Sequence, residues 1–456
     1  MLRTLARSLP QGAQLPSTRA VAAEQGVGPV TVQRAVRLLV AEGLVEPRPG
    51  VGNFVRERRI APSRADYSWQ TTSLGAAWPL REGMWGSGNR PVAPETIPLH
   101  STYPAASLLP TDLVRRAFAR AAKTEAVVNP APAPGVPELR RWFAEALTRS
   151  TIDAPLAASS DVVVVSGGQA GITAAFAALT RPGDAVVMES PTYWGGTVAA
   201  LAHGLRIVPI ARTADGIDPD DLDTALATSG ARVFYAQPTF ANPTGQSWTP
   251  AVRERVLEVV DAHKAFVIED DWARDFSIDD APPPPLATQD PHGHVVYLRS
   301  VTKSLAPSVR VGALIARGPA RTRLSGSRMA GELYTSGLLQ AVALDVLRDP
   351  GWERHQRTLP ARLRERRDAL TSALTAVGLA GFEPPSGGLA LWLRLADTTN
   401  ATAVVGRCLQ AGLALSAGPE WFPTEPDGQY LRLSFANADP HRFDEAARIL
   451  AGILAD

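Results

Sequence analysis

Lysine is rare in this chain. Only three of the 46 basic residues among its 456 residues are lysines, namely Lys123, Lys264 and Lys303. Arginine supplies almost every other positive charge, and its guanidinium group stays protonated in proteins. A lysine kept in such a chain is therefore a candidate for chemistry that needs a neutral primary amine, which arginine cannot provide.

Cysteine and long apolar runs are also scarce. The single cysteine, Cys408, excludes an internal disulfide and a zinc site built from several cysteines, and we predict no metal site. No run approaches the roughly 20 apolar residues that a membrane-spanning helix needs. The opening stretch MLRTLARSLPQGAQLPS lacks the apolar core of a signal peptide. These absences predict a cytoplasmic protein with no membrane partner.

Charge is distributed unevenly along the chain. Residues 1–60 contain nine arginines and four acidic residues, a net charge of +5, whereas the whole chain carries only +1. The remainder is therefore slightly acidic. A chain of 456 residues has room for two or three domains. A small basic module attached to a slightly acidic body predicts a polyanionic partner at the N-terminal end only.

The basic N-terminal stretch has the pattern of two helices and a hairpin. Ser17 is a suitable N-cap for a helix that runs to about Glu24, and Pro29 suits the first turn of the next helix. Gly43 is placed to end that second helix. The stretch LVEPRPGVGNFV, residues 44–55, alternates around a Pro-Gly turn and predicts a small hairpin. Four apolar residues recur at helical spacing in the second helix and predict a buried stripe: Val32, Ala35, Val36 and Leu39.

Helix, tight turn, helix and basic hairpin are the parts of a winged helix-turn-helix. Such a module inserts its second helix into the major groove of double-stranded DNA, with arginines on phosphates and base edges. On charge alone, the solvated face of an ordinary helical hairpin is an equally good interpretation. The candidate DNA contacts are Arg19, Thr31, Gln33, Arg34, Arg37 and Arg48.

The sequence motifs favour DNA binding. The stretches LPSTRAVA, TVQRAV, LVAEGLV and RPGVGNFV occur in this order within residues 15–55. They closely resemble the winged helix-turn-helix of the GntR family of bacterial regulators. The chain departs from the family at Gly28 and Pro29, where the family usually has Ser-Arg. Only MLRTLARSL precedes the module, which predicts either a trimmed first helix or a natural start farther upstream.

A change in composition follows the N-terminal module. Residues 58–96 hold prolines, glycines and tryptophans without a steady period, which predicts a linker that docks in places through Trp69, Trp78 and Trp85. We therefore predict three segments: a winged helix-turn-helix over residues 1–57, a linker over 58–96, and a body over 97–456 with a large part at about 97–330 and a small part at about 345–456.

Short β-rich runs alternate with helical stretches from residue 97 onward. Helical stretches such as residues 170–180 and 250–264 lie between several of the runs. This alternation predicts an α/β body with a mainly parallel sheet covered by helices, which binds ligands at the carboxyl ends of its strands. The predicted strands are DVVVVS (161–166), AVVMES (185–190), LRIVPI (205–210), ARVFYA (231–236), AFVIED (265–270), HVVYLR (294–299) and GALIA (312–316).

Chemically distinctive residues lie at the ends of five of these predicted strands. The first is followed by GGQAG, a turn that lets backbone N–H groups approach an anion at a helix N-terminus. Tyr193, Asn242 and Lys303 follow three of the others, and Asp270 ends a fourth. Each feature alone is more often structural, because glycine turns pack tightly and tyrosines fill cores. Five of them at the strand ends of one sheet predict a ligand site.

The series resembles the fold type I pyridoxal-phosphate (PLP) enzymes, the aspartate aminotransferase superfamily. The resemblance rests on the NPTG turn at residues 242–245, the aspartate at a strand end, and the Ser-x-x-Lys with a later arginine in residues 300–310. The stretches PSGGLALWLRL and YLRLSFAN resemble motifs of the small domain. The resemblance to fold type I enzymes implies a body of that fold, whose smaller C-terminal part is α+β.

The resemblance also implies a role for each site residue. Lys303 would hold the PLP aldehyde as a Schiff base, whereas Lys123 and Lys264 lie on polar helix surfaces. Trp272 stands where the family usually has a tyrosine, and AVVNPAPAPG, residues 126–135, stands where relatives often carry a tyrosine that reaches a neighbouring subunit's phosphate. The other implied roles are phosphate binding by Gly168, Gln169, Ser300 and Arg310, contact with the ring by Asp270, Asn242 and Tyr193, and binding of a substrate or effector carboxylate by Arg432.

A GntR-like head, a linker and an aminotransferase-like body together resemble the MocR subfamily of bacterial regulators. This implies a homodimeric, PLP-dependent transcriptional regulator that binds paired or repeated operator half-sites. An amino acid or amine effector would exchange with Lys303. Two alternatives stay open: a class I/II aminotransferase with an accessory N-terminal module, against which Trp272 weighs slightly, and a DNA-binding scaffold in which Lys303 is idle.

Overall fold

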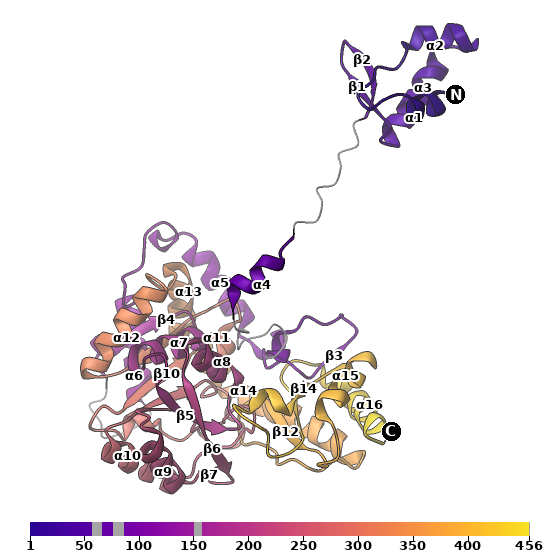
Figure 1. Cartoon of the computed structure of the whole chain (residues 1–456). Coiled ribbons are helices and arrows are strands. Elements are labelled where there is room, and N and C mark those ends of the chain that lie inside the picture. Colours follow the sequence, from indigo (N-terminus) through magenta and orange to yellow (C-terminus); the bar gives the residue numbers. More distant parts are fainter. Residues whose placement is uncertain (57–65, 76–85, 150–156, 456) are drawn as a thin grey trace. The chain divides into compact units, whose positions relative to one another are not determined.

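The computed structural model describes residues 1–56, 66–75, 86–149 and 157–455. The chain forms two compact units, residues 1–77 and 78–456 (Figure 1). Much of the predicted linker, including Trp78 and Trp85, lies outside the described residues. None of the helices in the described part is both long and apolar enough to cross a membrane.

The first unit contains the helices and the hairpin that the sequence predicts. Ser17 caps the second helix by accepting the Ala20 N–H at 3.2 Å, and Gly43 follows the third helix with φ 73°, a left-handed backbone angle that favours glycine. Strands β1 and β2 pair antiparallel as the predicted hairpin. The elements are α1 (Leu2–Ser8), α2 (Thr18–Gln25), α3 (Pro29–Ala41), β1 (Val45–Arg48), β2 (Gly52–Val55) and α4 (Ser68–Leu74).

Helix α3 forms the centre of the first unit. Its Leu39 is buried with Ala6 and Leu15 in one small core, and its Val32 is buried with Val21 in another. The predicted stripe is therefore confirmed, with Ala35 and Val36 partly buried beside these residues. Trp69 is 61% exposed and α4 contains no buried residue, so the docking predicted for Trp69 does not occur within the first unit.

A mixed sheet of eight strands forms the middle layer of the second unit. Its order is β4-β11-β10-β9-β8-β5-β6-β7, and only β11 and β7 run against the others. All seven predicted strands form, and the two-residue strand β7 was not predicted. The strands are β4 (Val162–Val165), β5 (Ala185–Ser190), β6 (Arg206–Thr213), β7 (Gly216–Ile217), β8 (Val233–Ala236), β9 (Phe266–Asp271), β10 (Val295–Ser300) and β11 (Gly312–Ile315).

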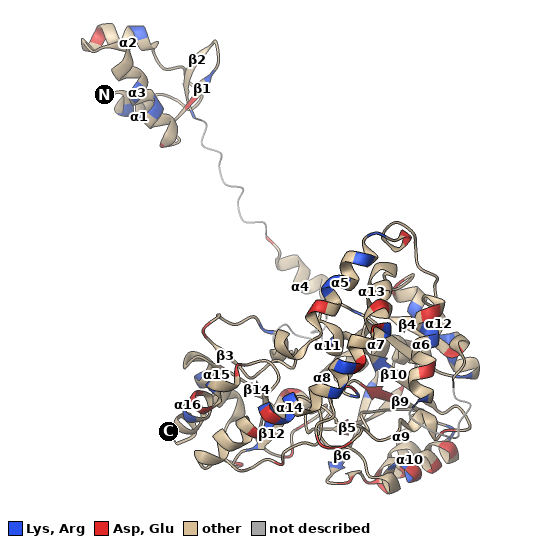
Figure 2. Ribbon diagram, turned by 180° about the vertical axis from the view of Figure 1, so that it is seen from behind, with Lys and Arg blue, Asp and Glu red and all other residues tan. Residues whose placement is uncertain are grey.

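Helices cover both faces of this sheet because its central strands are apolar on both sides. In β10, Val296 and Leu298 pack on one face, whereas Val295 and Tyr297 pack on the other. Charged residues lie mainly on the outer helices (Figure 2). One face carries α7 (Gly168–Leu179), α8 (Trp194–Ala202) and α12 (Gly318–Gly331), and the other carries α5 (Thr111–Ala121), α6 (Pro137–Thr148), α9 (Pro219–Ser229), α10 (Pro250–His263) and α13 (Gly337–Arg348).

The C-terminal part of the second unit has its own core. An antiparallel sheet of order β12-β15-β14 packs with three helices, and β13 pairs with β3. This arrangement is the α+β part implied by the sequence. Its elements are β3 (Ile97–Pro98), α14 (Pro350–Ala376), β12 (Ala390–Arg394), α15 (Ala401–Gln410), β13 (Leu413–Ala414), β14 (Ser416–Ala417), β15 (Tyr430–Ser434) and α16 (Phe443–Ala455).

Candidate functional site

One pocket of the second unit lies where β4, β5, β8, β9 and β10 end. All nine residues that the resemblance assigns to the cofactor line it: Gly168, Gln169, Tyr193, Asn242, Asp270, Trp272, Ser300, Lys303 and Arg310. The sheet therefore brings together residues that are up to 142 positions apart in the chain, as expected for the carboxyl ends of parallel strands.

One end of the pocket has the features of an anion site. Gly167 has φ 86°, and a Cβ atom there would lie 3.0 Å from Nη2 of Arg310 and 3.1 Å from Oγ1 of Thr302. The side-chain oxygen of Thr302 is buried and has no hydrogen-bond partner in the part of the chain that the structure describes. Helix α7 begins at Gly168, so its N-terminal amides add partial positive charge. This donor set fits a phosphate group.

Lys303 projects from the short helix α11 (Thr302–Leu305), which follows β10. Its amine donates a hydrogen bond to Oγ1 of Thr102 at 3.3 Å. Burial, followed by the positive charge of Arg432, lowers the pKa of Lys303 to about 7, although the Asp270 charge opposes this shift. A large fraction of this amine is therefore neutral near pH 7, which is the form that attacks an aldehyde.

Asp270 is held at the end of β9 by two donors. The Tyr235 hydroxyl donates to Oδ2 of Asp270 at 2.7 Å, and Nε2 of Gln237 donates to the same oxygen at 2.8 Å. Burial raises the pKa of Asp270 to about 6, while these hydrogen bonds and the Lys303 charge oppose the rise. Oε1 of Gln237 accepts the Asn242 N–H at 2.9 Å. Gln237 therefore fixes Asp270 and Asn242 relative to each other.

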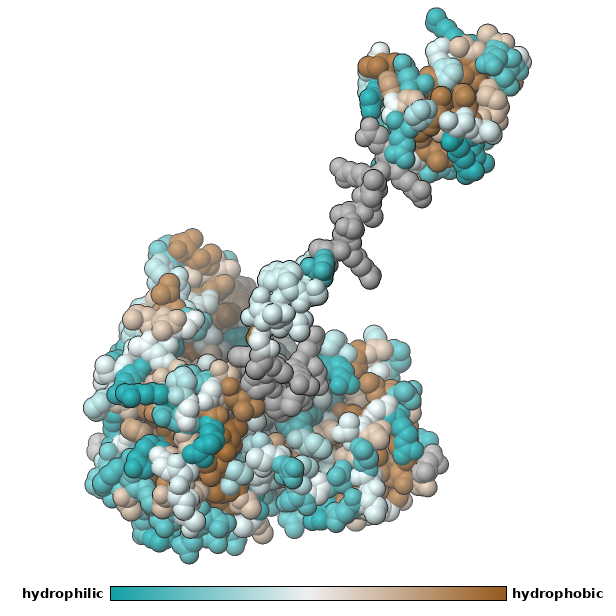
Figure 3. Space-filling view, viewed as in Figure 1, coloured by the Kyte–Doolittle hydropathy of each residue, from teal (hydrophilic) through white to brown (hydrophobic). Residues whose placement is uncertain are grey.

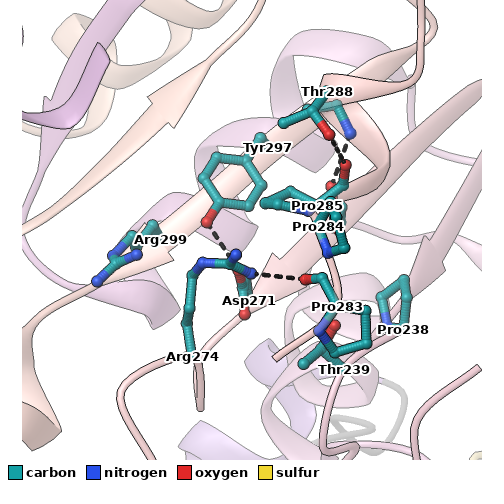
Figure 4. Close-up of polar contacts among 12 residues, drawn as sticks. Pro238, Thr239, Asp271, Arg274, Pro283, Pro284, Pro285, Thr288, Tyr297 and Arg299 are labelled. Carbon is teal, nitrogen blue, oxygen red and sulfur yellow. Dashed lines mark hydrogen bonds and ion pairs between the residues drawn. The ribbon is translucent and has the colours of Figure 1, made fainter. Parts of the chain in front are cut away.

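The neighbouring carboxylate, Asp271, belongs to a separate network (Figure 4). Its Oδ2 accepts from the Tyr297 hydroxyl at 2.7 Å and from Nη1 of Arg274 at 3.2 Å. Arg274 also donates to the Pro283 carbonyl at 3.0 Å. Because successive side chains of a strand point to opposite faces, Asp270 faces the pocket and Asp271 ties the strand end to the protein behind it.

Two aromatic side chains flank the pocket. The Tyr193 hydroxyl donates to Oε1 of Gln169 at 3.2 Å, and Nε2 of Gln169 donates to the Gly195 carbonyl at 2.8 Å. The Trp272 indole N–H donates to the Phe240 carbonyl at 3.0 Å, so it is not available to a ligand. The ring of Trp272 instead covers Lys303, whose amine lies 4.2 Å from the ring centre.

Arg432 lies beside this pocket rather than in its lining. It belongs to an adjoining small pocket that shares Asn242 and Trp272 with the first. Arg432 is 1% exposed, and burial lowers its pKa to about 10. Its Nη1 donates to the His100 carbonyl at 3.3 Å, whereas Nε and Nη2 have no partner among the described residues. These two unused donors fit a carboxylate.

The candidate DNA contacts lie on the surface of the first unit. All six are exposed: Arg19, Thr31, Gln33, Arg34, Arg37 and Arg48. Thr31, Gln33, Arg34 and Arg37 belong to α3, outside its buried stripe, and the guanidinium of Arg48 lies 4.4 Å from the ring centre of Phe54 on the hairpin. Figure 2 shows basic positions on both the helices and the hairpin.

The sequence models of two protein families match separate parts of the chain. The model described as aminotransferase class I and II matches residues 101–450. The chain belongs to this family. The model described as bacterial regulatory proteins, gntR family, matches residues 3–55, which identifies the first unit as a DNA-binding domain. A gntR domain followed by an aminotransferase-like body is the MocR-type architecture that the sequence predicted, and the cofactor of such bodies is PLP.

Two similar regulators align with nearly the whole chain, and a solved aminotransferase aligns with most of it. The uncharacterized HTH-type transcriptional regulator YdfD of Bacillus subtilis is 26% identical over 94% of this chain and 89% of its own. The probable rhizopine catabolism regulatory protein MocR of Rhizobium meliloti is 27% identical over 98% of this chain and 90% of its own. The α-aminoadipate aminotransferase LysN of Thermus thermophilus, solved with N-(5'-phosphopyridoxyl)-L-leucine, covers 79% of this chain and 92% of its own at 26% identity, with a TM-score of 0.73.

Four pocket residues were not predicted from the sequence. Gln237 follows β8 in the same way that Asp270 ends β9, so its strand-end position is a signal that could have identified it. Thr302 lies beside Lys303 in the quoted motif, and only its buried oxygen distinguishes it. Ile172 lies one turn of α7 after Gly168, so its helical spacing could have identified it, whereas Tyr103 lacks a local motif and only the tertiary fold brings it into the pocket.

Proposed function

We propose that this protein is a PLP-dependent transcriptional regulator of cytoplasmic location that senses an amino compound at Lys303. The observation that carries the proposal is the presence, in one chain, of a gntR-type DNA-binding domain and a pocket with all the residue types that PLP requires. An enzyme without a regulatory role does not need the DNA-binding domain. A DNA-binding scaffold without a cofactor does not need the pocket.

The pocket residues fit PLP group by group. Gly168, Ser300 and Arg310 would bind the phosphate, together with the unpartnered oxygen of Thr302. Lys303 would hold the aldehyde carbon. When bound, PLP supplies an aldehyde that primary amines can capture and a ring that withdraws electrons.

The remaining residues would orient the ring. Asp270 would place its carboxylate at the ring nitrogen and hold a proton there, because Tyr235 and Gln237 fix its Oδ2. Asn242 would bind the ring hydroxyl, and Tyr193 would cover one ring face. Trp272 would shield the Lys303 amine from water, since its ring already lies over that amine.

The effector class follows from Lys303 and Arg432. Only a compound with a primary amine can replace Lys303 at an aldehyde, and the unused donors of Arg432 favour a compound that also carries a carboxylate. Together they support an amino acid or a related amino carboxylate as effector. The effector would change the state of the body, and the operator affinity of the N-terminal domain would change with it.

We further propose that the protein acts as a homodimer on paired or repeated half-sites, as the MocR resemblance implies. An exposed apolar surface of the second unit supports this proposal: Val127, Val128, Met329 and Leu333 are 50% to 74% exposed. The two segments that carry these residues are adjacent, because Arg328 donates to the carbonyls of Ala133, Glu332 and Leu333. Figure 3 shows hydrophobic surface near the loop between α5 and α6.

A second candidate function is an aminotransferase with an accessory N-terminal module. The complete residue set around Lys303 favours it, and the 2-aminoadipate transaminase of Thermus thermophilus is 28% identical over 77% of this chain. Turnover distinguishes the two candidates. The regulator proposal predicts amino acid binding without sustained transfer of amino groups to oxo acids, and multiple turnovers at an ordinary enzymatic rate would favour the enzyme.

The test of the proposed function is operator binding by α3. Arg34→Ala combined with Arg37→Ala removes two exposed positive charges of this helix, so affinity for DNA fragments selected with the wild-type protein falls by about tenfold or more. Fluorescence anisotropy measures the affinity. The control is Arg115→Ala with Arg116→Ala, which removes two exposed charges from α5. Equal affinity of both variants for the fragments would argue against the regulator.

A further inference from the structure

A series of short polar contacts links Arg432 to the predicted linker. Nη1 of Arg432 and Oγ of Ser416 each donate to the His100 carbonyl oxygen at 3.3 Å. Oγ of Ser416 lies 2.7 Å from Oγ of Ser87, which belongs to the predicted linker segment. The Ser87 N–H donates to Oε2 of Glu420 at 3.1 Å, and the Ser87 hydroxyl donates to the other oxygen of this carboxylate.

Ser87 holds the C-terminal end of the linker segment on the body. It begins a short 3₁₀ helix, Ser87–Asn89, in the first described stretch of the second unit. Gly86 lies against the body as well, because a Cβ atom there would lie 3.4 Å from the Trp194 ring. The chain that leads from the DNA-binding domain is thus attached to the body next to the proposed effector site.

Glu420 and Arg432 are oppositely charged and mostly surrounded by protein. Burial raises the pKa of Glu420, while the hydrogen bonds from Ser87 and the positive charge of Arg432 lower it. The charge of Glu420 in turn favours the protonated form of Arg432. Trp421, the residue after Glu420, has its ring centre 4.6 Å from the Arg432 guanidinium. The attachment of Ser87 and the charge of Arg432 therefore depend on the same carboxylate.

We propose that Ser87 and Glu420 form an anchor for the linker that weakens when Arg432 binds the carboxylate of an effector. The inference rests on the proposed function, since it takes the effector to be an amino carboxylate. A second anion at Arg432 offsets the positive charge that favours the ionised form of Glu420, and it draws the guanidinium from the His100 carbonyl. Both effects weaken the path to Ser87. Glu420 is a positioning residue here, because effector binding at Arg432 changes the hold on the linker only by way of the Glu420 carboxylate.

Amide hydrogen exchange of Ser87 in the full-length PLP-bound protein tests the anchor without any effector. Arg432→Met removes a positive charge that favours the ionised form of Glu420, so the acceptor of the Ser87 N–H weakens and this amide exchanges about fivefold faster or more. Arg432→Lys keeps the charge and leaves the rate near that of the wild type, as does the control Arg394→Met, a partly exposed arginine of β12. In a Glu420→Gln variant the Ser87 amide already exchanges fast. Adding Arg432→Met to this variant gives no further increase in the exchange rate. An unchanged rate in Arg432→Met, or an equal added effect in both backgrounds, would overturn the proposal.

A second experiment adds a ligand, either L-alanine or ethylamine. Both compounds carry a primary amine, but only L-alanine also carries a carboxylate. The change in PLP absorption shows when L-alanine has saturated the protein. Saturating L-alanine then speeds hydrogen exchange of the Ser87 amide about fivefold in the wild type, and ethylamine does not. A change in absorption without a change in Ser87 exchange would overturn the anchor and leave effector capture standing. No absorption change with L-alanine or any other amino acid, combined with the expected effect of Arg432→Met, would instead refute effector sensing and keep the anchor.

Discussion

Lys303 shows how the surroundings of one residue determine its chemistry. The sequence singles it out because lysine is rare and because it lies in a recognisable motif. The structure adds the causes of its lowered pKa, which are burial and the nearby charges of Arg432 and Arg310. The sequence could not supply these causes, because Arg432 is 129 positions away in the chain.

The rate at which PLP attaches to Lys303 should depend on pH. Only the neutral amine reacts, so the rate rises as pH increases through about 7 and levels off above it. Arg432→Met removes a cation that lowers the pKa of Lys303, and the midpoint moves to higher pH. Stopped-flow absorption after mixing the PLP-free protein with PLP measures the rate. A midpoint that stays in place, or moves to lower pH, would contradict this electrostatic explanation.

At the scale of helices and strands, regular local patterns could be predicted and tertiary contacts could not. All seven main strands of the sheet were predicted, because apolar β-rich runs are bounded by turns and helices. The short strands β3, β7, β13 and β14 were not, since each has only two residues and depends on a distant partner or a tight turn. Trp69 is exposed within the first unit, and composition alone does not show whether a tryptophan finds a surface to bury against.

Helix α2 offers a test at the same scale. Ser17→Ala removes the side-chain acceptor of the Ala20 N–H, so α2 loses about 1 kcal/mol of stability, which is about fivefold in its opening equilibrium. Amide exchange within residues 18–25 of the full-length protein measures this change. Ser8→Ala is the control, since the Ser8 hydroxyl donates to a carbonyl of its own helix and caps no N-terminus. Equal exchange in the two variants would show that the cap contributes little.

At the scale of the whole molecule, the presence of both units in one chain carries most of the functional argument. The aminotransferase-like body alone is compatible with catalysis, and the DNA-binding domain alone is compatible with any regulator. Both domains could be recognised from the sequence because their motifs are local. The path from Arg432 through His100 and Ser416 to Ser87 could not, because it joins residues from four separate segments.

The exposed apolar surface near the loop between α5 and α6 makes a prediction about assembly. Val128→Asp combined with Leu333→Asp places charges where two copies of the chain would bury apolar side chains, so the dimer dissociates at least tenfold more readily. Analytical ultracentrifugation measures the dissociation constant. Leu38→Asp with Val51→Asp, two exposed apolar residues of the first unit, is the control. A dimer equally stable in both double variants would place the interface elsewhere.

The most direct test of the central claim is transcript abundance of the genes beside the DNA sites that the protein occupies in its own cells. Cells with the wild-type protein are compared with cells that carry Lys303→Ala. If Lys303 links an amino compound to gene control, the protein occupies discrete sites with repeated half-sites, and the variant changes the adjacent transcripts several-fold. Absence of occupied sites, or identical transcripts in the two strains, would contradict the claim.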